Sequence, residues 1–209
     1  MEGTSLFLKT NDKKVLIIGS GEVGSRRAER FLDTRAEVII VGNTISDMLK
    51  DKGATLKSIK SKEDVDTLVK WADIIIIASG DNELNEYVGK VSKDMEKLVN
   101  RADYPEKGNI IVPTKFKIAD IEISIYTQGK SPLVAKKLRE KLEKAISEKD
   151  ILEIEVQDHV RSILKDKIDS QKKRKEILYE IANNNEIVKL ISEGKLNTAK
   201  KYAEDIINS

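Results

Sequence analysis

The sequence predicts an α/β protein: a Rossmann-like, doubly wound parallel sheet, then a small α+β segment and an α-helical C-terminal region. Three observations predict this order. Short apolar runs alternate with helical patterns over residues 1–112. A strand with alternating polarity and one helix follow over 113–149, and 150–209 shows helical spacing throughout. We therefore expect three domains with these boundaries.

The predicted strand at residues 14–19 is a short, nearly continuous apolar run, which is typical of a strand buried on both faces of a parallel sheet, and residues 37–41 predict a second buried strand. Helical spacing separates them, for example at Ala28, Phe31 and Leu32. Strands that alternate with helices imply right-handed crossovers. We expect the strands at residues 14–19, 37–41, 54–59 and 73–79, with shorter ones at 98–100 and 109–113.

The pattern changes after Pro113. Residues 121–126 alternate isoleucine with polar residues or tyrosine, which predicts a half-buried strand in an antiparallel pair or a subunit interface. Ser131-Pro132 has the residue types that begin a helix. Asn183–Asn185 predicts a break between the later helices.

Composition excludes several classes of protein. Among 209 residues, 38 Lys and Arg balance 36 Asp and Glu, which argues against a dedicated nucleic-acid binder. There is no cysteine, and His159 is the single histidine, so disulfides, thiolate zinc sites and histidine clusters are excluded. No apolar run approaches the ~20 residues of a spanning helix, and no signal peptide is evident. We expect a soluble, cytoplasmic protein without membrane or nucleic-acid partners.

A glycine loop is the first chemical signal. Gly19, Gly21 and Gly24 fit G-x-G-x-x-G directly after a predicted strand and before a helix. In that context the glycines permit a tight turn, close approach of a pyrophosphate and close helix packing, while the helix N-terminus supplies N–H donors. The motif favours a bound dinucleotide over a glycine-rich turn that binds nothing.

The acidic residue that usually holds the ribose of NAD is missing. The end of the second strand carries Gly42, Asn43 and Thr44 instead. Asn43 and Thr44 can still hydrogen-bond hydroxyl groups, but the choice of NAD over NADP loses its usual evidence. Arg26 and Arg27 either face a phosphate or form a solvated helix face.

Two more loops follow predicted strands, where ligands of such sheets bind. Residues 79–85, which begin with Ser79, could line a ribose or nicotinamide, or Asp81 or Asn82 could simply cap a helix. Asn100 and Asp103 follow a short apolar strand. Asp103 suits a general base, a substrate-orienting group or a turn-forming aspartate.

Four segments together resemble the precorrin-2 dehydrogenase family of siroheme synthesis, including the dehydrogenase part of siroheme synthases. They are LFLKTNDKKVLIIGSGEVGSRRAERFL, IIIIASGDNELNEYV, LVNRADYPEKGNIIVP and ISIYTQGKSPLVAKKLREKLE, in order over residues 6 to about 145. The glycine loop alone is shared by many enzymes. Its combination with N-x-x-D and the GKSP segment is much more specific.

The resemblance implies NAD-dependent oxidation of precorrin-2 to sirohydrochlorin, with Asp103 as the catalytic aspartate after the matching Asn100. It also implies cofactor contacts at Glu22, Val23, Asn43 and Thr44. The family generally lacks the ribose carboxylate. Three residues depart from its pattern: Arg101 and Ala102 replace small apolar residues, and Tyr104 replaces a residue that is often acidic or small.

The implied substrate is a polycarboxylate, which suits cationic side chains and helix N–H groups. Gly129, Lys130 and Ser131 of the TQGKSP loop are the candidates. Other cations lie behind them in the sequence: Lys115, Lys117 and Arg139. The family's central segment makes a homodimer, and residues 121–126 with the helix after Ser131 suit that role.

Two alternatives remain. Some family members also insert iron, which here would rest on carboxylates, with Asp103 the obvious one; we assign no metal ligand, and we expect His159 to be a packed or surface residue. The other alternative is a nucleotide-sensing regulatory module. Such modules usually keep an acidic residue where this chain has Gly42, and they have no reason to carry GKSPLVAKKLREKLE, so the enzyme is favoured.

Overall fold

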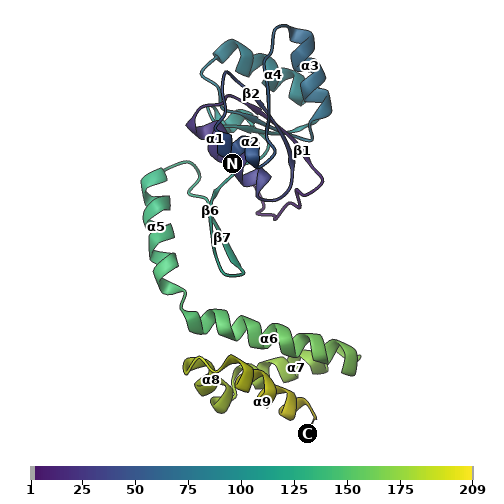
Figure 1. Cartoon of the computed structure of the whole chain (residues 1–209), viewed down its shortest axis with the longest axis vertical. Helices are drawn as coiled ribbons and strands as arrows, with labels where there is room; N and C mark the ends of the chain where they lie inside the picture. Colours follow the sequence, from purple (N-terminus) through teal and green to yellow (C-terminus); the bar gives the residue numbers. More distant parts are fainter. Residues whose placement is uncertain (1–2, 209) are drawn as a thin grey trace. The chain divides into compact units, whose positions relative to one another are not determined.

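The computed structural model describes residues 3–208 and divides the chain into two compact units, 1–112 and 113–209 (Figure 1). A further boundary at residue 150, within the second unit, stays a prediction. No helix in the described part is both long and apolar enough to cross a membrane.

The first unit contains a parallel sheet with helices on both faces, as the sequence predicts. Its five strands lie in the order β3-β2-β1-β4-β5. They are β1 (Lys14–Ile18), β2 (Glu37–Val41), β3 (Thr55–Lys57), β4 (Ile74–Ile77) and β5 (Leu98–Arg101). The connecting helices are α1 (Glu22–Leu32), α2 (Asp47–Asp51), α3 (Lys62–Trp71), α4 (Asn82–Asp94) and the short 3-10 helix η1 (Pro105–Lys107).

Successive residues of the central strands supply two separate cores. Leu16 and Ile18 of β1 pack with residues of α3 and α4, whereas Val15 and Ile17 pack with residues of α1 and α2. This explains why the strands are apolar at every position and not only at alternate ones. Each fully buried aliphatic side chain contributes about 1.5–3 kcal/mol of transfer free energy to folding. Because the strands are stabilised in this way, the strand ends that carry the site are held in place.

The strand predicted at residues 109–113 is wrong, and those residues form no strand. Asn109 instead lies along the free edge of β5: its backbone N–H donates to the carbonyl of Val99, and its side chain accepts from the N–H of Val99 at 2.6 Å. Ile110 and Val112 pack against the core on the α1 side. An apolar run next to a sheet edge therefore serves here to cover the edge of β5 and the core beside it.

The short helix α2 was not predicted.

The second unit begins with an antiparallel pair, β6 (Thr114–Ile118) and β7 (Ile121–Ile125). Of the two alternatives given for residues 121–126, the antiparallel pair is confirmed, although its partner strand β6 was not predicted. Helix α5 (Pro132–Ala145) begins where expected: Ser131 Oγ accepts from the N–H of Val134, and proline occupies the first turn. Ser131 thus sets the start of α5.

Four more helices complete the second unit: α6 (Glu148–Lys167), α7 (Gln171–Ala182), α8 (Asn185–Ser192) and α9 (Leu196–Asn208). Val156, Val160 and Leu164 of α6 pack with residues of the other three helices. The predicted break is confirmed, because Asn184 caps α8. His159 Nε2 lies 2.6 Å from Glu204 Oε1 of α9 and its side chain is 33% exposed, which agrees with the expected packed or surface histidine.

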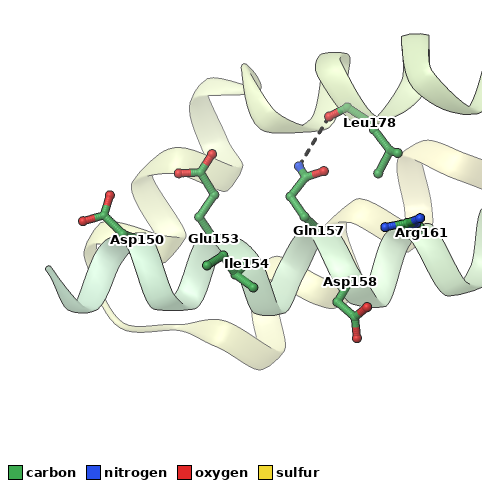
Figure 2. Close-up of a pocket in the computed structure, with 7 residues that line it drawn as sticks. All are labelled: Asp150, Glu153, Ile154, Gln157, Asp158, Arg161 and Leu178. Carbon is green, nitrogen blue, oxygen red and sulfur yellow. Dashed lines mark hydrogen bonds between the residues drawn. The ribbon is translucent and has the colours of Figure 1, made fainter. Parts of the chain in front are cut away.

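A surface hollow of about 550 Å³ lies beside α6 and α7 (Figure 2). Gln157 Nε2 donates to the carbonyl of Leu178 across it at 3.3 Å, which ties the two helices together. Its lining residues are Asp150, Glu153, Ile154, Gln157, Asp158, Arg161 and Leu178. Since none of the predicted site residues lines this hollow, we interpret it as a feature of helix packing.

Candidate active site

Three strands of the first unit end at the same edge of the sheet because they are parallel. β1 leads into the glycine loop at Gly19, β4 leads into Ser79, and β5 leads into Asp103. The sheet order changes direction between β1 and β4, since β2 lies on one side of β1 and β4 on the other. Ligands of doubly wound sheets bind at this point of the carboxyl edge.

Gly19 and Gly24 are required by their surroundings. Gly19 has a φ of +111°, and a Cβ there would lie 2.5 Å from the carbonyl oxygen of Ala78. A Cβ on Gly24 would lie 1.9 Å from the carbonyl oxygen of Gly19. The absence of a side chain at these two positions lets the loop lie directly against the end of β4 and lets α1 begin close to Gly19. This is the geometry expected of a dinucleotide-binding turn.

The N-terminus of α1 differs from those of the other helices. Its N-cap is Gly21, which forms no side-chain cap, and a Cβ there would meet nothing within 4 Å. Among the other α-helices with described N-caps, all are capped by a side chain; the caps are Ser46, Ser61, Asp81, Ser131, Ser147, Ser170 and Asn184. The first N–H groups of α1 are therefore left for another acceptor, which fits a pyrophosphate.

The end of β2 explains the missing ribose carboxylate. A Cβ on Gly42 would lie 2.5 Å from the Cβ of Ser20 and 3.0 Å from its backbone N, so a larger side chain there would require the glycine loop to shift. Asn43 and Thr44 follow and are exposed. Their amide and hydroxyl groups have the chemistry to bind hydroxyls, and their role in cofactor binding stays a prediction.

The two arginines of α1 behave differently. Arg26 is exposed and pairs with Glu22 at 3.3 Å, which favours a solvated helix face. Arg27 is half-buried, and within the described chain its Nε has no hydrogen-bond partner. Burial, followed by the charges of Arg30 and Arg26, lowers the pKa of Arg27 to about 10. Burial disfavours the charged form of Arg27, and a nearby anion would offset that cost. Arg26 is exposed and carries no such cost.

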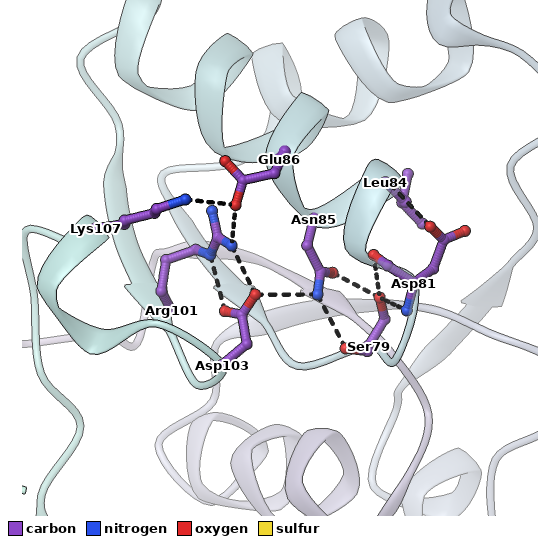
Figure 3. Close-up of polar contacts among 8 residues, drawn as sticks. All are labelled: Ser79, Asp81, Leu84, Asn85, Glu86, Arg101, Asp103 and Lys107. Carbon is purple, nitrogen blue, oxygen red and sulfur yellow. Dashed lines mark hydrogen bonds and ion pairs between the residues drawn. The ribbon is translucent and has the colours of Figure 1, made fainter.

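Asp103 lies in a cluster of paired polar side chains, which we call the Asp103 cluster (Figure 3). Its members are Ser79, Asn85, Glu86, Arg101, Asp103 and Lys107. Arg101 Nε donates to Asp103 Oδ1 at 2.8 Å, and Nη2 donates to Oδ2 at 2.6 Å. The side chain of Arg101 is only 3% exposed, and that of Asp103 is 17% exposed. This is a two-pronged ion pair with one edge open to solvent.

Asn85 connects Asp103 to the end of β4. Its Nδ2 donates to Asp103 Oδ2 at 3.2 Å and to the carbonyl of Ser79 at 2.9 Å, while its Oδ1 accepts from Ser79 Oγ at 2.6 Å. Ser79 is thus engaged within the protein through its side chain. The capping role considered for this segment is confirmed for Asp81, which accepts from the N–H of Leu84 at 3.0 Å.

Sequence reasoning missed Asn85, although a signal was present. Asn85 is fully buried on the same face of α4 as Val88, three residues later. A polar amide on the apolar face of a helix must find partners inside the protein, and here they are Ser79 and Asp103. Arg101 was noticed only as a departure from the family pattern.

The charges of the cluster reinforce one another. Hydrogen bonds from Arg101 hold the pKa of Asp103 below its usual range, against the opposing effect of burial, and backbone N–H groups of Tyr104 and Asp103 add to the lowering. Hydrogen bonds from Arg101 and Lys107 lower the pKa of Glu86. Asp103 also raises the pKa of Arg101. Asp103 is therefore a carboxylate at neutral pH.

Asn100 offers a buried acceptor at the end of β5. It is 5% exposed, and its Nδ2 donates to the carbonyl of Ile110 at 3.0 Å. Its Oδ1 is buried and has no hydrogen-bond partner among the described residues. A buried carbonyl oxygen without a donor is costly, which is consistent with a donor supplied by a ligand.

The TQGKSP loop belongs to the second unit. The N–H of Lys130 donates to the carbonyl of Thr127, and Gln128 and Gly129 both have positive φ, which makes a tight turn. Lys130 is exposed and forms no ion pair within the described chain, whereas Ser131 is occupied as the cap of α5. The other proposed cations are paired: Lys115 with Glu122, Lys117 with Asp120 and Arg139 with Glu143.

Comparison with known proteins identifies the family. Residues 6–114 match the family model described as "Putative NAD(P)-binding". The chain is 33% identical over 188 residues to the "Putative precorrin-2 dehydrogenase" of Methanocaldococcus jannaschii, covering 86% of this chain and 89% of the relative. The chain belongs to the precorrin-2 dehydrogenase family.

Another precorrin-2 dehydrogenase, from Methanosarcina barkeri, is 28% identical over 212 residues, covering 98% of this chain and 93% of that protein. The solved structure titled "SirC, precorrin-2 dehydrogenase" covers 97% of this chain and all of its own, with a TM-score of 0.76 and 24% identity. At that identity it shows a common fold for both units. The resemblance stated from the four sequence segments is thereby confirmed.

Proposed function

We propose that this protein oxidises precorrin-2 to sirohydrochlorin with NAD. The observation that carries the proposal is the position of Asn100 and Asp103, which lie at the same sheet edge as the glycine loop in a member of the precorrin-2 dehydrogenase family. The match extends through the second unit, which a nucleotide-sensing module gives no reason to expect.

The cofactor is assigned to the edge formed by β1, β2 and β4. The backbone of Gly19, Gly21 and Gly24, with Glu22 and Val23, would hold the pyrophosphate at the uncapped start of α1. Asn43 and Thr44 would bind ribose hydroxyls, and Ser79 would contact the cofactor through its backbone at the end of β4. NAD, when bound, supplies a nicotinamide ring that accepts a hydride.

The oxidation removes a hydride and a proton from precorrin-2. Asp103 would accept a hydrogen bond from a pyrrole-type N–H of the macrocycle, and the free Oδ1 of Asn100 would accept a second. Both groups act by holding the substrate. The released proton passes to water at the exposed edge of Asp103.

The acidic side chains of the substrate would meet the TQGKSP loop. Lys130 supports this assignment because it is exposed and forms no ion pair within the described chain, and the turn at Gly129 presents it next to Ser131.

We place the enzyme in the cytoplasm.

A homodimer formed through the β6–β7 and α5 region belongs to the same proposal. A two-stranded sheet with one helix buries little apolar surface by itself. Three large apolar residues of α5 are exposed: Leu133, Val134 and Leu138. A second copy would cover them, and the mass in solution tests this.

The deciding experiment is an anaerobic absorbance assay with precorrin-2 and either NAD or NADP. We expect the more conjugated product with NAD, and no spectral change with either nucleotide would overturn the dehydrogenase. Iron insertion is the alternative for a second activity. Adding ferrous iron separates the two, since siroheme formed faster than without enzyme would establish insertion.

A further inference from the structure

Arg101 is the part of the Asp103 cluster that the proposed function does not use. It stands between the motif residues Asn100 and Asp103, and it is almost completely buried at the end of β5. A buried guanidinium is costly to desolvate unless it is fully paired. Its partners therefore indicate why an arginine is present there.

The contact with Asp103 fixes the carboxylate in two ways. Nε and Nη2 each donate to a different oxygen, at 2.8 and 2.6 Å, so the carboxylate lies with its two oxygens against the planar guanidinium. A paired fork of this kind defines both position and rotation, which a single lysine contact does not. Asn85 of α4 adds a third side-chain donor to the carboxylate, at Oδ2.

Arg101 is itself held from the other side. Nη2 also donates to Glu86 Oε1 at 2.8 Å, and Lys107 pairs with that same oxygen at 2.9 Å (Figure 3). Gly89, in the middle of α4, leaves room for the guanidinium: a Cβ there would lie 2.9 Å from Arg101 Nη1. A mid-helix glycine costs about 1 kcal/mol against alanine, and this close approach gives its reason.

We propose that Arg101 is a positioning residue for the dehydrogenation, fixing the Asp103 carboxylate in the one orientation in which it meets the substrate. The inference rests on the proposed function, because Asp103 has to be the group that faces precorrin-2. Arg101 has no contact with substrate or cofactor in this scheme and acts through Asp103 alone.

A consequence concerns the proton. The charged and polar groups facing Asp103 are Arg101 from β5, Asn85 from α4 and the N–H of Tyr104, with Glu86 and Lys107 behind Arg101. So many donors make the carboxylate a weak proton acceptor at neutral pH. Asp103 thus remains an anion that orients the substrate, and water takes the proton.

The test compares Arg101→Met with Lys107→Met, a matched control that removes the neighbouring cation on Glu86 without touching Asp103. Two quantities are measured: the pKa of the Asp103 carboxyl by NMR of carbon-13-labelled aspartate, and kcat/KM against pH. In Arg101→Met we expect the Asp103 pKa to rise, the acid limb of kcat/KM to move to higher pH with it, and kcat/KM to fall by up to about 100-fold. Lys107 contacts Glu86 and not Asp103, so Lys107→Met should shift the Asp103 pKa and the acid limb much less than Arg101→Met does.

Arg101→Lys covers the case in which Arg101→Met does not fold. It keeps the charge and loses the two-pronged contact, so we expect about a tenfold loss of kcat/KM with the acid limb still low. Wild-type kcat/KM in Arg101→Lys, or an unchanged acid limb in a folded Arg101→Met, would overturn the proposal. The NMR titration needs no turnover. If the wild-type protein is inactive with precorrin-2 while the Asp103 pKa still rises in Arg101→Met, the proposed function is overturned. If the wild-type protein is active but the Asp103 pKa does not move in Arg101→Met, the role of Arg101 alone is overturned.

Discussion

The glycine loop and the Asp103 cluster lie at the same edge of one sheet and are built in opposite ways. At the glycine loop, α1 begins without a side-chain cap, and the space around Gly21 is open. At the Asp103 cluster, each carboxylate oxygen accepts a hydrogen bond from Arg101 while one edge of the carboxylate stays exposed, and Asn85 bonds through both its Nδ2 and its Oδ1. The glycine loop leaves the first N–H groups of α1 to a ligand, whereas the Asp103 cluster pairs its charged side chains with one another.

The difference indicates two modes of recognition. A backbone turn with unpaired N–H groups can bind a phosphate because it has no side chain that blocks the turn and no cap that occupies the N–H groups. A carboxylate held by a buried guanidinium is oriented before the substrate arrives, so little ordering remains to be done on binding. Substitutions should therefore affect binding at the first region and turnover at the second.

The largest expected effect is that of Gly24→Ala. Its Cβ would collide with the backbone of Gly19, and backbone cannot move aside as a flexible side chain can. We expect the free energy of unfolding to fall by about 3 kcal/mol or more, with NAD binding lost. Urea unfolding and nucleotide titration measure the two. Gly21→Ala is the control, since nothing lies near its Cβ; an equal loss of stability there would contradict the contact argument.

Asp103→Ala should come next. Without the carboxylate we expect turnover of precorrin-2 to fall by at least about 100-fold, while NAD binds as before, because Asp103 acts on the substrate. Asp81→Ala is the matched control: it removes the cap of α4 and about 1 kcal/mol of stability but leaves turnover intact. Near-wild-type turnover in Asp103→Ala would remove this residue from the mechanism.

The acid stability of the protein should depend on Asp103. Its pKa is lower in the folded state than the unfolded value of about 3.9, so its pairing with Arg101 stabilises the fold above that pH and is lost as pH falls through the folded pKa. We expect the advantage of wild type over Asp103→Asn in urea unfolding to shrink below about pH 4. A constant difference between pH 7 and pH 3 would show that the pair contributes no such dependence.

Gly21→Ser should have the smallest effect and gives the sharpest comparison. A serine at the N-cap adds the acceptor that α1 lacks, so we expect a few tenths of a kcal/mol of added stability. The same hydroxyl competes with the pyrophosphate, so NAD affinity should fall below that of Gly21→Ala, which has the Cβ without the oxygen. Equal NAD affinity in the two variants would mean that the uncapped amides do not bind the cofactor.

Much of the first unit was predictable because β1, β2 and β4 are buried on both faces, whereas β3 is exposed. Four isoleucines in β4 and the glycines after β1 define a strand and a turn with few alternatives. The run at residues 109–113 is also rich in isoleucine and valine but lies at the sheet edge, where Asn109 bonds the backbone of Val99. Composition does not distinguish a strand from a segment that covers one.

The site was predictable only in part. Asn100, Asp103 and the glycine loop follow strands and could be placed at one edge from the order of the elements. The partners of Asp103 could not, because Asn85 lies 18 residues earlier in the chain and reaches it only through the packing of α4 on the sheet. Arg101 likewise became interpretable only with Gly89 and Glu86 beside it.

The cover on β5 has a consequence for solubility. An edge strand exposes a row of unpaired N–H and C=O groups that another chain can extend into a larger sheet. Here Asn109 occupies both groups of Val99 and donates from Nδ2 to the carbonyl of Lys97. A neighbouring molecule therefore finds the edge groups of Val99 and the carbonyl of Lys97 already paired, which disfavours intermolecular pairing along this part of β5.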